Sequence, residues 1–89
     1  AALAGAQGVT VAPHYHWDIH VHLGCATREV AVLEKFVGTN VKNFDLLIHN
    51  PREVTPRGTL VPPEGHGLGI EWNEQAIRKY LVEEKVFSP

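Results

Sequence analysis

The sequence reads Val9-Thr-Val-Ala-Pro-His14 near its beginning and Val30-Ala-Val-Leu-Glu34 further along the chain. Both segments are short, apolar and rich in β-branched residues, which is typical of buried strands in a parallel sheet. Between them, a helix is predicted from Asp18, a suitable N-cap, to about Ala26. Strand, helix and strand in this order indicate a βα repeat of an α/β fold.

Helical signals also flank this repeat. The alanine-rich residues 1–8 predict the end of a helix, with Gly8 as its left-handed cap. Asn73 is a good N-cap for an amphipathic helix over residues 74–83. Gly, Pro and Asn residues punctuate the chain from residue 38 to residue 70, which predicts a turn-rich segment between the two halves.

Apolar periodicity predicts which side of the helix over residues 18–26 is buried. Ile19, His22 and Leu23 fall on one face, so we expect this face to pack inward and His22 to be a core histidine. We expect Cys25 to be a small buried residue, because no basic partner or second cysteine indicates a reactive thiolate.

Composition excludes several classes of protein. The chain has 89 residues, of which 44% are hydrophobic and 20% charged, values that fit one domain or less and are too apolar for disorder. A formal net charge of −2 provides no basic surplus for binding nucleic acid, and the apolar runs are too short to span a membrane. One cysteine cannot form an internal disulfide, and residues 1–8 lack the basic start of a signal peptide. We therefore expect a cytoplasmic protein.

Histidines are concentrated in one place, with four of the six between residues 14 and 22. On a helix, His16 and His20 are four residues apart and could share one metal ion. The zinc-protease pattern needs Glu directly after the first His, and Trp17 stands there instead, so this pattern is excluded. A simple two-His metal-binding module stays open as an alternative.

A second alternative is a small jelly roll of the cupin type. Gly8, five further residues and His14-Tyr-His16 resemble the start of the first cupin motif, whose histidines bind a metal. The acidic residue expected shortly afterwards is replaced by His20 and Val21. Pro63-Glu-Gly65 resembles the second motif, but Leu68 stands where its histidine belongs.

A third interpretation accounts for more of the chain. His14 and Glu34 each end a predicted strand, and the C-terminal strand ends of a parallel α/β barrel meet at its catalytic face. The two side chains are therefore predicted to act as acid and base on one substrate. The spacing and order of several motifs resemble the C-terminal part of the mandelate racemase group of the enolase superfamily. The matching motifs are Val9-Thr-Val-Ala-Pro-His14, Ile19-His-Val-His-Leu23, Cys25-Ala-Thr27, Leu33-Glu34, Gly58-Thr-Leu-Val-Pro62, Gly67-Leu-Gly-Ile-Glu-Trp72 and Ile77-Arg-Lys-Tyr80.

The resemblance implies an α/β fold, namely the last helix–strand–helix–strand of a (β/α)8 TIM-type barrel followed by a return segment of the capping domain. Residues 1–45 would form the last βα units of the barrel. Residues 46–89 would form the C-terminal segment that packs on the barrel and the capping domain. Such a chain leaves open sheet edges, so we expect a homo-oligomer or association with the rest of the barrel.

By the same resemblance, His14 corresponds to the seventh-strand base, or to the acid that protonates a leaving hydroxyl. Glu34 corresponds to the eighth-strand carboxyl that binds the substrate carboxylate, a role that needs a protonated group with a raised pKa. Tyr15 and Trp17, in the loop after His14, are expected to bind substrate.

The family removes a proton next to a carboxylate and holds the resulting enediolate on Mg²⁺. Its magnesium ligands lie on the third, fourth and fifth strands, so no ligand is expected within these residues. The implied parent enzyme is a lyase that dehydrates a sugar acid, and a racemase or epimerase of a 2-hydroxy acid is the alternative. The 89-residue chain alone is expected to be inactive.

Overall fold

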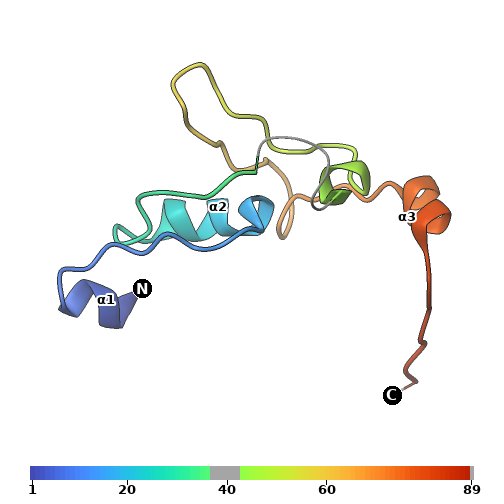
Figure 1. The fold of residues 1–89 in the computed structure, drawn as a ribbon, viewed down its shortest axis with the longest axis horizontal. Helices are drawn as coiled ribbons and strands as arrows, with labels where there is room; N and C mark the ends of the chain where they lie inside the picture. Colours follow the sequence, from blue (N-terminus) through green and yellow to red (C-terminus); the bar gives the residue numbers. More distant parts are fainter. Residues whose placement is uncertain (37–42, 89) are drawn as a thin grey trace.

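A computed structural model describes residues 1–36 and 43–88 of the chain. Within these ranges the elements are α1 (Ala2–Ala6), α2 (Trp17–Ala26), the short 3-10 turn η1 (Asn43–Leu46) and α3 (Glu74–Tyr80), as shown in Figure 1. An isolated antiparallel bridge joins Ile48 to Trp72. The beginning of the predicted turn-rich segment, at residues 38–42, lies outside the described ranges.

The two predicted strands are not seen as strands in the described residues. Residues 9–12 and 29–33 run beside each other near α2 as extended chain (Figure 1). A backbone hydrogen bond from Val11 N–H to Glu29 O, at 2.8 Å, joins these two segments. The barrel portion of the predicted fold is therefore not observed. The physical reason is that a pair of short strands is at best marginally stable without further strands beside it.

The helix-end prediction at Gly8 is confirmed. Gly8 has a φ of 65°, the left-handed conformation that favours glycine. Its N–H donates to Gly5 O at 3.1 Å, and Val9 N–H donates to Ala4 O at 2.9 Å. These two bonds form a Schellman motif, which satisfies carbonyl groups at the end of α1. The helix ends there, and the chain continues in extended conformation to His14.

The N-cap of helix α2 lies two residues earlier than predicted. His16, in a left-handed conformation, occupies the N-cap position, so Asp18 lies inside the first turn rather than capping it. The buried residues are Trp17, Asp18 and Val21.

The predicted buried face of α2 is wrong. Ile19 and Leu23 are 41% and 39% exposed, and Cys25 is exposed as well. His22 is partly exposed, with Nε2 lying 3.1 Å from Leu68 O. The segments around Val30 and Arg52 contact α2 at Gly24 and Asp18, and the buried residues of the helix are Trp17, Asp18 and Val21 instead of Ile19 and Leu23.

Hydrogen bonds of Asn50 organise the C-terminal segment. Asn50 Nδ2 donates to Gly69 O at 2.8 Å, and Asn50 Oδ1 accepts from Glu71 N–H at 3.0 Å. Next to these contacts, His49 N–H donates to Glu71 O at 2.7 Å, and Ile48 is buried. These contacts hold residues 48–50 against residues 69–72 without a regular sheet.

The predicted cap of the last helix is confirmed. Asn73 Oδ1 accepts a hydrogen bond from Ala76 N–H at 3.1 Å. The helix ends at Tyr80 rather than at residue 83, and residues 81–88 are exposed. Nothing in the described chain packs over this last stretch, so its apolar side chains do not extend the helix.

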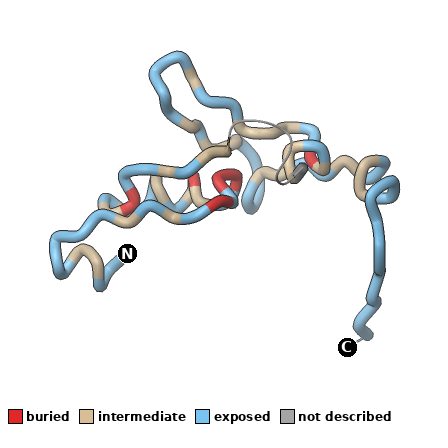
Figure 2. The backbone as a smooth tube through the Cα atoms, viewed as in Figure 1, coloured by how far each residue is buried: buried red, intermediate tan, exposed pale blue. Residues whose placement is uncertain are grey.

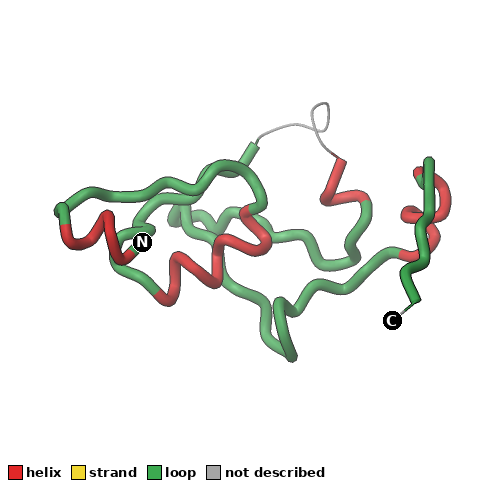
Figure 3. Tube along the Cα trace, turned by 90° about the horizontal axis from the view of Figure 1, so that it is seen from below, coloured by secondary structure: helices red, strands yellow, loops and turns green. Residues whose placement is uncertain are grey.

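Few side chains are fully buried among the described residues. The buried positions are Tyr15, Trp17, Asp18, Val21, Val30 and Ile48. Figure 2 shows no buried position at either end of the described chain. The accessible surface is 7179 Å², whereas a compact monomer of this mass exposes about 5,200 Å². The radius of gyration is 15.5 Å against about 12 Å for a compact chain of this length. The open arrangement is clear from below as well (Figure 3), and no helix in the described ranges is long and apolar enough to cross a bilayer.

Candidate active site

His14 and Glu34 come together at one end of the two extended segments. His14 Nδ1 lies 2.6 Å from Glu34 Oε2, and the two side chains are 76% and 43% exposed. A carboxylate accepts hydrogen bonds, so Nδ1 carries the hydrogen in this contact. Nε2 is then the nitrogen of His14 that is available for proton exchange with a bound molecule. The sequence predicted that these residues meet, and the structure places them in direct contact.

The carboxylate of Glu34 is held in its ionised form. Its Oε2 also accepts a hydrogen bond from Tyr15 N–H at 3.0 Å. This backbone bond, followed by the contact with His14, lowers the pKa of Glu34 below its usual value. The expectation of a raised pKa is therefore wrong for this chain, because Glu34 is exposed and two donors stabilise its charge.

The turn that connects His14 to α2 has an unusual backbone. Tyr15 and His16 have φ values of 53° and 46°, and both are non-glycine residues in the left-handed region. Such a conformation costs about 1–2 kcal/mol per residue. The turn must therefore be held by contacts with the rest of the chain.

Aromatic packing supplies part of this support. The Tyr15 side chain is 5% exposed and stacks on Phe36 with ring centroids 5.3 Å apart. Trp17 is 4% exposed and meets the Tyr15 ring at 5.1 Å. Lys35 Nζ lies 4.4 Å from the centre of a Trp17 ring, within the range of a cation–π contact. Both Tyr15 and Trp17 thus support the turn, and their role in binding substrate stays a prediction.

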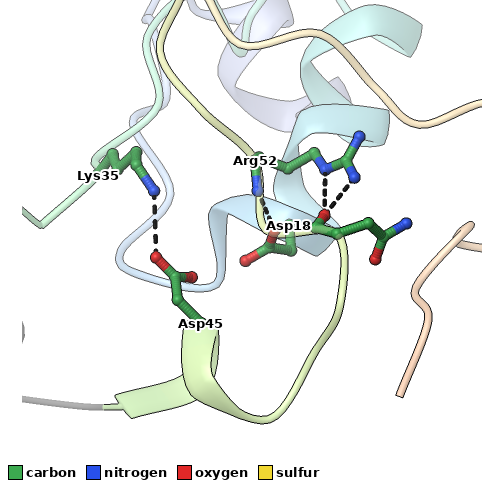
Figure 4. Close-up of polar contacts among 5 residues, drawn as sticks. Asp18, Lys35, Asp45 and Arg52 are labelled. Carbon is green, nitrogen blue, oxygen red and sulfur yellow. Dashed lines mark hydrogen bonds and ion pairs between the residues drawn. The ribbon is translucent and has the colours of Figure 1, made fainter. Parts of the chain in front are cut away.

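A partly buried polar cluster that the sequence did not reveal lies next to this turn. Figure 4 shows Asp18 accepting from the backbone N–H of Arg52, at 3.2 Å, and Lys35 Nζ near Asp45 Oδ2, at 3.5 Å. The guanidinium of Arg52 donates to Asn50 O. These contacts join the start of α2, the segment after Glu34 and the C-terminal segment.

Asp18 is the most buried charged group of the described chain, with an exposure of 2%. Its Oδ2 has no hydrogen-bond partner among the described residues. Burial raises the pKa of Asp18, and Asp45 adds to the rise, while the Arg52 N–H bond, Lys35 and the charge of Arg52 oppose it. Burial also raises the pKa of Tyr15, with smaller contributions from Asp45 and Asp18.

The model of the family described as enolase C-terminal domain-like matches residues 1–76, which is most of the chain. The chain belongs to this family. No curated protein and no solved structure matches the chain. Membership of the enolase C-terminal domain-like family, together with a helix at residues 17–26 where a jelly roll needs strands, shows that the cupin alternative is wrong.

Enolase-superfamily enzymes typically use Mg²⁺. Among residues 1–36 and 43–88, no group of three or more His, Cys, Asp or Glu side chains could hold a metal ion. The described residues of this enolase-type chain therefore do not fit a magnesium site. His16 and His20, the pair considered for a metal, have ring centroids 6.4 Å apart, and His20 Nδ1 already contacts Tyr15 O.

Proposed function

We propose that this chain is the C-terminal part of the barrel of an enzyme that removes the proton next to a carboxylate, and that the reaction is dehydration of a sugar acid. The contact between His14 and Glu34 in a chain of this family is the observation that carries the proposal. It pairs a histidine, the residue that most often serves as a general acid or base, with a carboxylate that holds it in one orientation.

In this proposal, His14 performs the proton transfers. Its Nε2 takes the proton from the carbon next to the substrate carboxylate, and Glu34 stabilises the imidazolium that forms. His14 then returns the proton to the hydroxyl on the neighbouring carbon as the C–O bond breaks. The products are water and an enol that becomes a 2-keto-3-deoxy acid. Any magnesium ligands are proposed to lie in residues beyond these 89.

The exposed surface supports the proposal that other chain segments complete the barrel. About 2,000 Å² more surface is accessible than in a compact monomer of this mass, which is comparable to a stable protein–protein interface. An open groove of about 390 Å³ lies between α2, residues 30–33 and residues 58–60, away from His14. We propose that the rest of the barrel, or a second copy, covers this surface.

The test uses the longest natural polypeptide that contains these residues, incubated with Mg²⁺ and a panel of sugar acids in D₂O. We expect at least one acid to form a 2-keto-3-deoxy product, detected as its semicarbazone. His14→Asn should abolish exchange of the α-proton with solvent. Because asparagine keeps a polar side chain of smaller size, its effect reports on proton transfer rather than on folding.

His66→Asn is the matched control, because His66 lies exposed in a distant turn. It should leave product formation and proton exchange unchanged. Proton exchange without loss of water, together with inversion of a 2-hydroxy acid, would favour the racemase or epimerase alternative. Unchanged exchange in His14→Asn would remove His14 from the mechanism and refute the proposal.

A further inference from the structure

His20 lies one turn into α2, and its side chain reaches back to the turn that carries His14. His20 Nδ1 lies 2.7 Å from the carbonyl oxygen of Tyr15. We propose that His20 is a positioning residue for the His14–Glu34 pair, because its Nδ1–H holds the strained peptide that sets the direction of His14. The inference rests on the proposed function in so far as that pair is the catalytic one.

The contacts of Tyr15 explain why this peptide matters. On one side, Tyr15 N–H donates to Glu34 Oε2 at 3.0 Å, next to the contact of the same oxygen with His14. On the other side, Tyr15 O accepts from His20. A rotation of the Tyr15 backbone would therefore break a bond to the carboxylate and turn His14, its direct neighbour in sequence.

His20 binds the turn with two different groups. Its backbone N–H donates to His16 O at 2.9 Å. Its side-chain Nδ1–H donates to the carbonyl oxygen of Tyr15, the residue before His16. His16 has no side-chain hydrogen bond capping the helix, so capping by His16 itself does not hold the turn. Two adjacent left-handed residues persist only when surrounding contacts determine them, and His20 provides such contacts from inside α2.

The chemistry of the contact determines the tautomer of His20. A carbonyl oxygen can only accept, so Nδ1 must carry the hydrogen whether the ring is neutral or protonated. Asparagine places an amide N–H close to the position of Nδ1, whereas glutamine places it close to the position of Nε2. These two substitutions therefore separate the hydrogen bond from the mere presence of a polar side chain.

The experiment measures the titration of Glu34 by the ¹³C shift of its side-chain carboxyl, in the full 89-residue chain. The wild-type pKa should lie below the usual value for glutamate, as the bonds from Tyr15 and His14 require. His20→Gln should move it up toward the usual value, and His20→Asn should keep it low. Long-range ¹H–¹⁵N spectra should show Nδ1–H as the neutral tautomer of wild-type His20.

His22→Leu is the matched control, because His22 lies on the same helix and contacts Leu68 instead of the turn. It should leave the Glu34 titration unchanged. Near-ultraviolet circular dichroism of the aromatic side chains, Trp17 among them, checks that each variant keeps its packing. A low Glu34 pKa in folded His20→Gln, or an ordinary pKa in the wild type, would overturn the inference.

A kinetic measurement separates this inference from the proposed function. In the longer natural enzyme, His20→Gln should lower kcat by about 10²-fold with little change in KM, since a displaced base loses its alignment. His20→Asn should restore most of the rate. If His14→Asn leaves proton exchange intact while the Glu34 titration responds to His20, the proposed function fails and the positioning role of His20 stands.

Discussion

Asp18 provides a quantitative test of how buried charge affects the stability of this chain. Its side chain is 2% exposed, one oxygen accepts from Arg52 N–H at 3.2 Å, and the other has no partner among the described residues. Asp18→Asn keeps the shape and an acceptor for Arg52 but removes the buried charge. We expect this variant to be more stable than the wild type at pH 7.

The expected gain is a difference between two opposing effects. Removing the desolvated charge of Asp18 is worth about 1–3 kcal/mol, and weakening of the charge-assisted bond to Arg52 costs about 1 kcal/mol. The net expectation is a gain of about 1 kcal/mol, which changes the folded-to-unfolded ratio by roughly fivefold. The variant amide nitrogen inherits the unpaired position of Oδ2, which keeps the gain at this modest size.

The stability difference between Asp18→Asn and the wild type should depend on pH in a defined direction. Because the pKa of Asp18 is raised in the folded chain, the folded state retains the Asp18 proton to higher pH than the unfolded state does. Its contribution to stability is therefore complete below the unfolded pKa, about 3.9, and is lost as the pH rises through the folded pKa. The higher free energy of unfolding of Asp18→Asn should therefore appear as the pH rises through the folded pKa of Asp18, and it should persist at neutral pH.

The assay is urea unfolding between pH 3 and pH 7.5, followed by tryptophan fluorescence, for the wild type and Asp18→Asn. The difference between the two proteins cancels the titration of the other carboxylates. Glu53→Gln is the matched control, because Glu53 is exposed and also adjoins Arg52 in sequence; it should change stability by less than about 0.5 kcal/mol. A variant that is less stable than the wild type at pH 7, or a pH-independent difference, would refute the reasoning.

Two further predictions concern packing and capping. Val21→Ala should lower the free energy of unfolding by about 2 kcal/mol in the urea titration, because Val21 is 1% exposed. Val32 is 58% exposed, so Val32→Ala should change this free energy by less than about 0.5 kcal/mol. Asn73→Ala should destabilise α3 by about 1 kcal/mol and reduce the protection of residues 74–80 against amide hydrogen exchange, while Asn73→Asp should retain the cap. Equal protection in the wild type and both variants would contradict a capping role for the contact between Asn73 Oδ1 and Ala76 N–H.

The caps at Gly8 and Asn73 were predicted correctly from the sequence because they depend on neighbouring residues. The Gly8 cap needs a residue that accepts a positive φ, and the Asn73 cap needs a side-chain oxygen within three residues of Ala76. The predicted strands failed for the opposite reason. A strand is defined by its neighbours, and residues 9–12 and 30–33 have no ladder of hydrogen bonds between them or with other described residues.

In the candidate site, too, some features were predicted from the sequence and others depend on the folded structure. Position at the ends of two apolar segments was enough to predict that His14 and Glu34 meet, and the contact at 2.6 Å agrees with this expectation. The ionisation of Glu34 was predicted in the wrong direction, because the bond from Tyr15 N–H depends on a left-handed turn. Likewise, the role of Asp18 depends on Arg52, which is 34 residues away.

The amino-acid sequence by itself determined the family, the caps of α1 and α3, and the pair of residues to be brought together. The tertiary structure decided which groups interact: it lowered the pKa of Glu34, buried Asp18 and directed His20 toward Tyr15. Caps, repeats and motifs arise from interactions along a few residues of chain, so their pattern is visible in the sequence. Burial and the pKa values that follow from it arise from groups distant in sequence, and these become neighbours only when the chain folds.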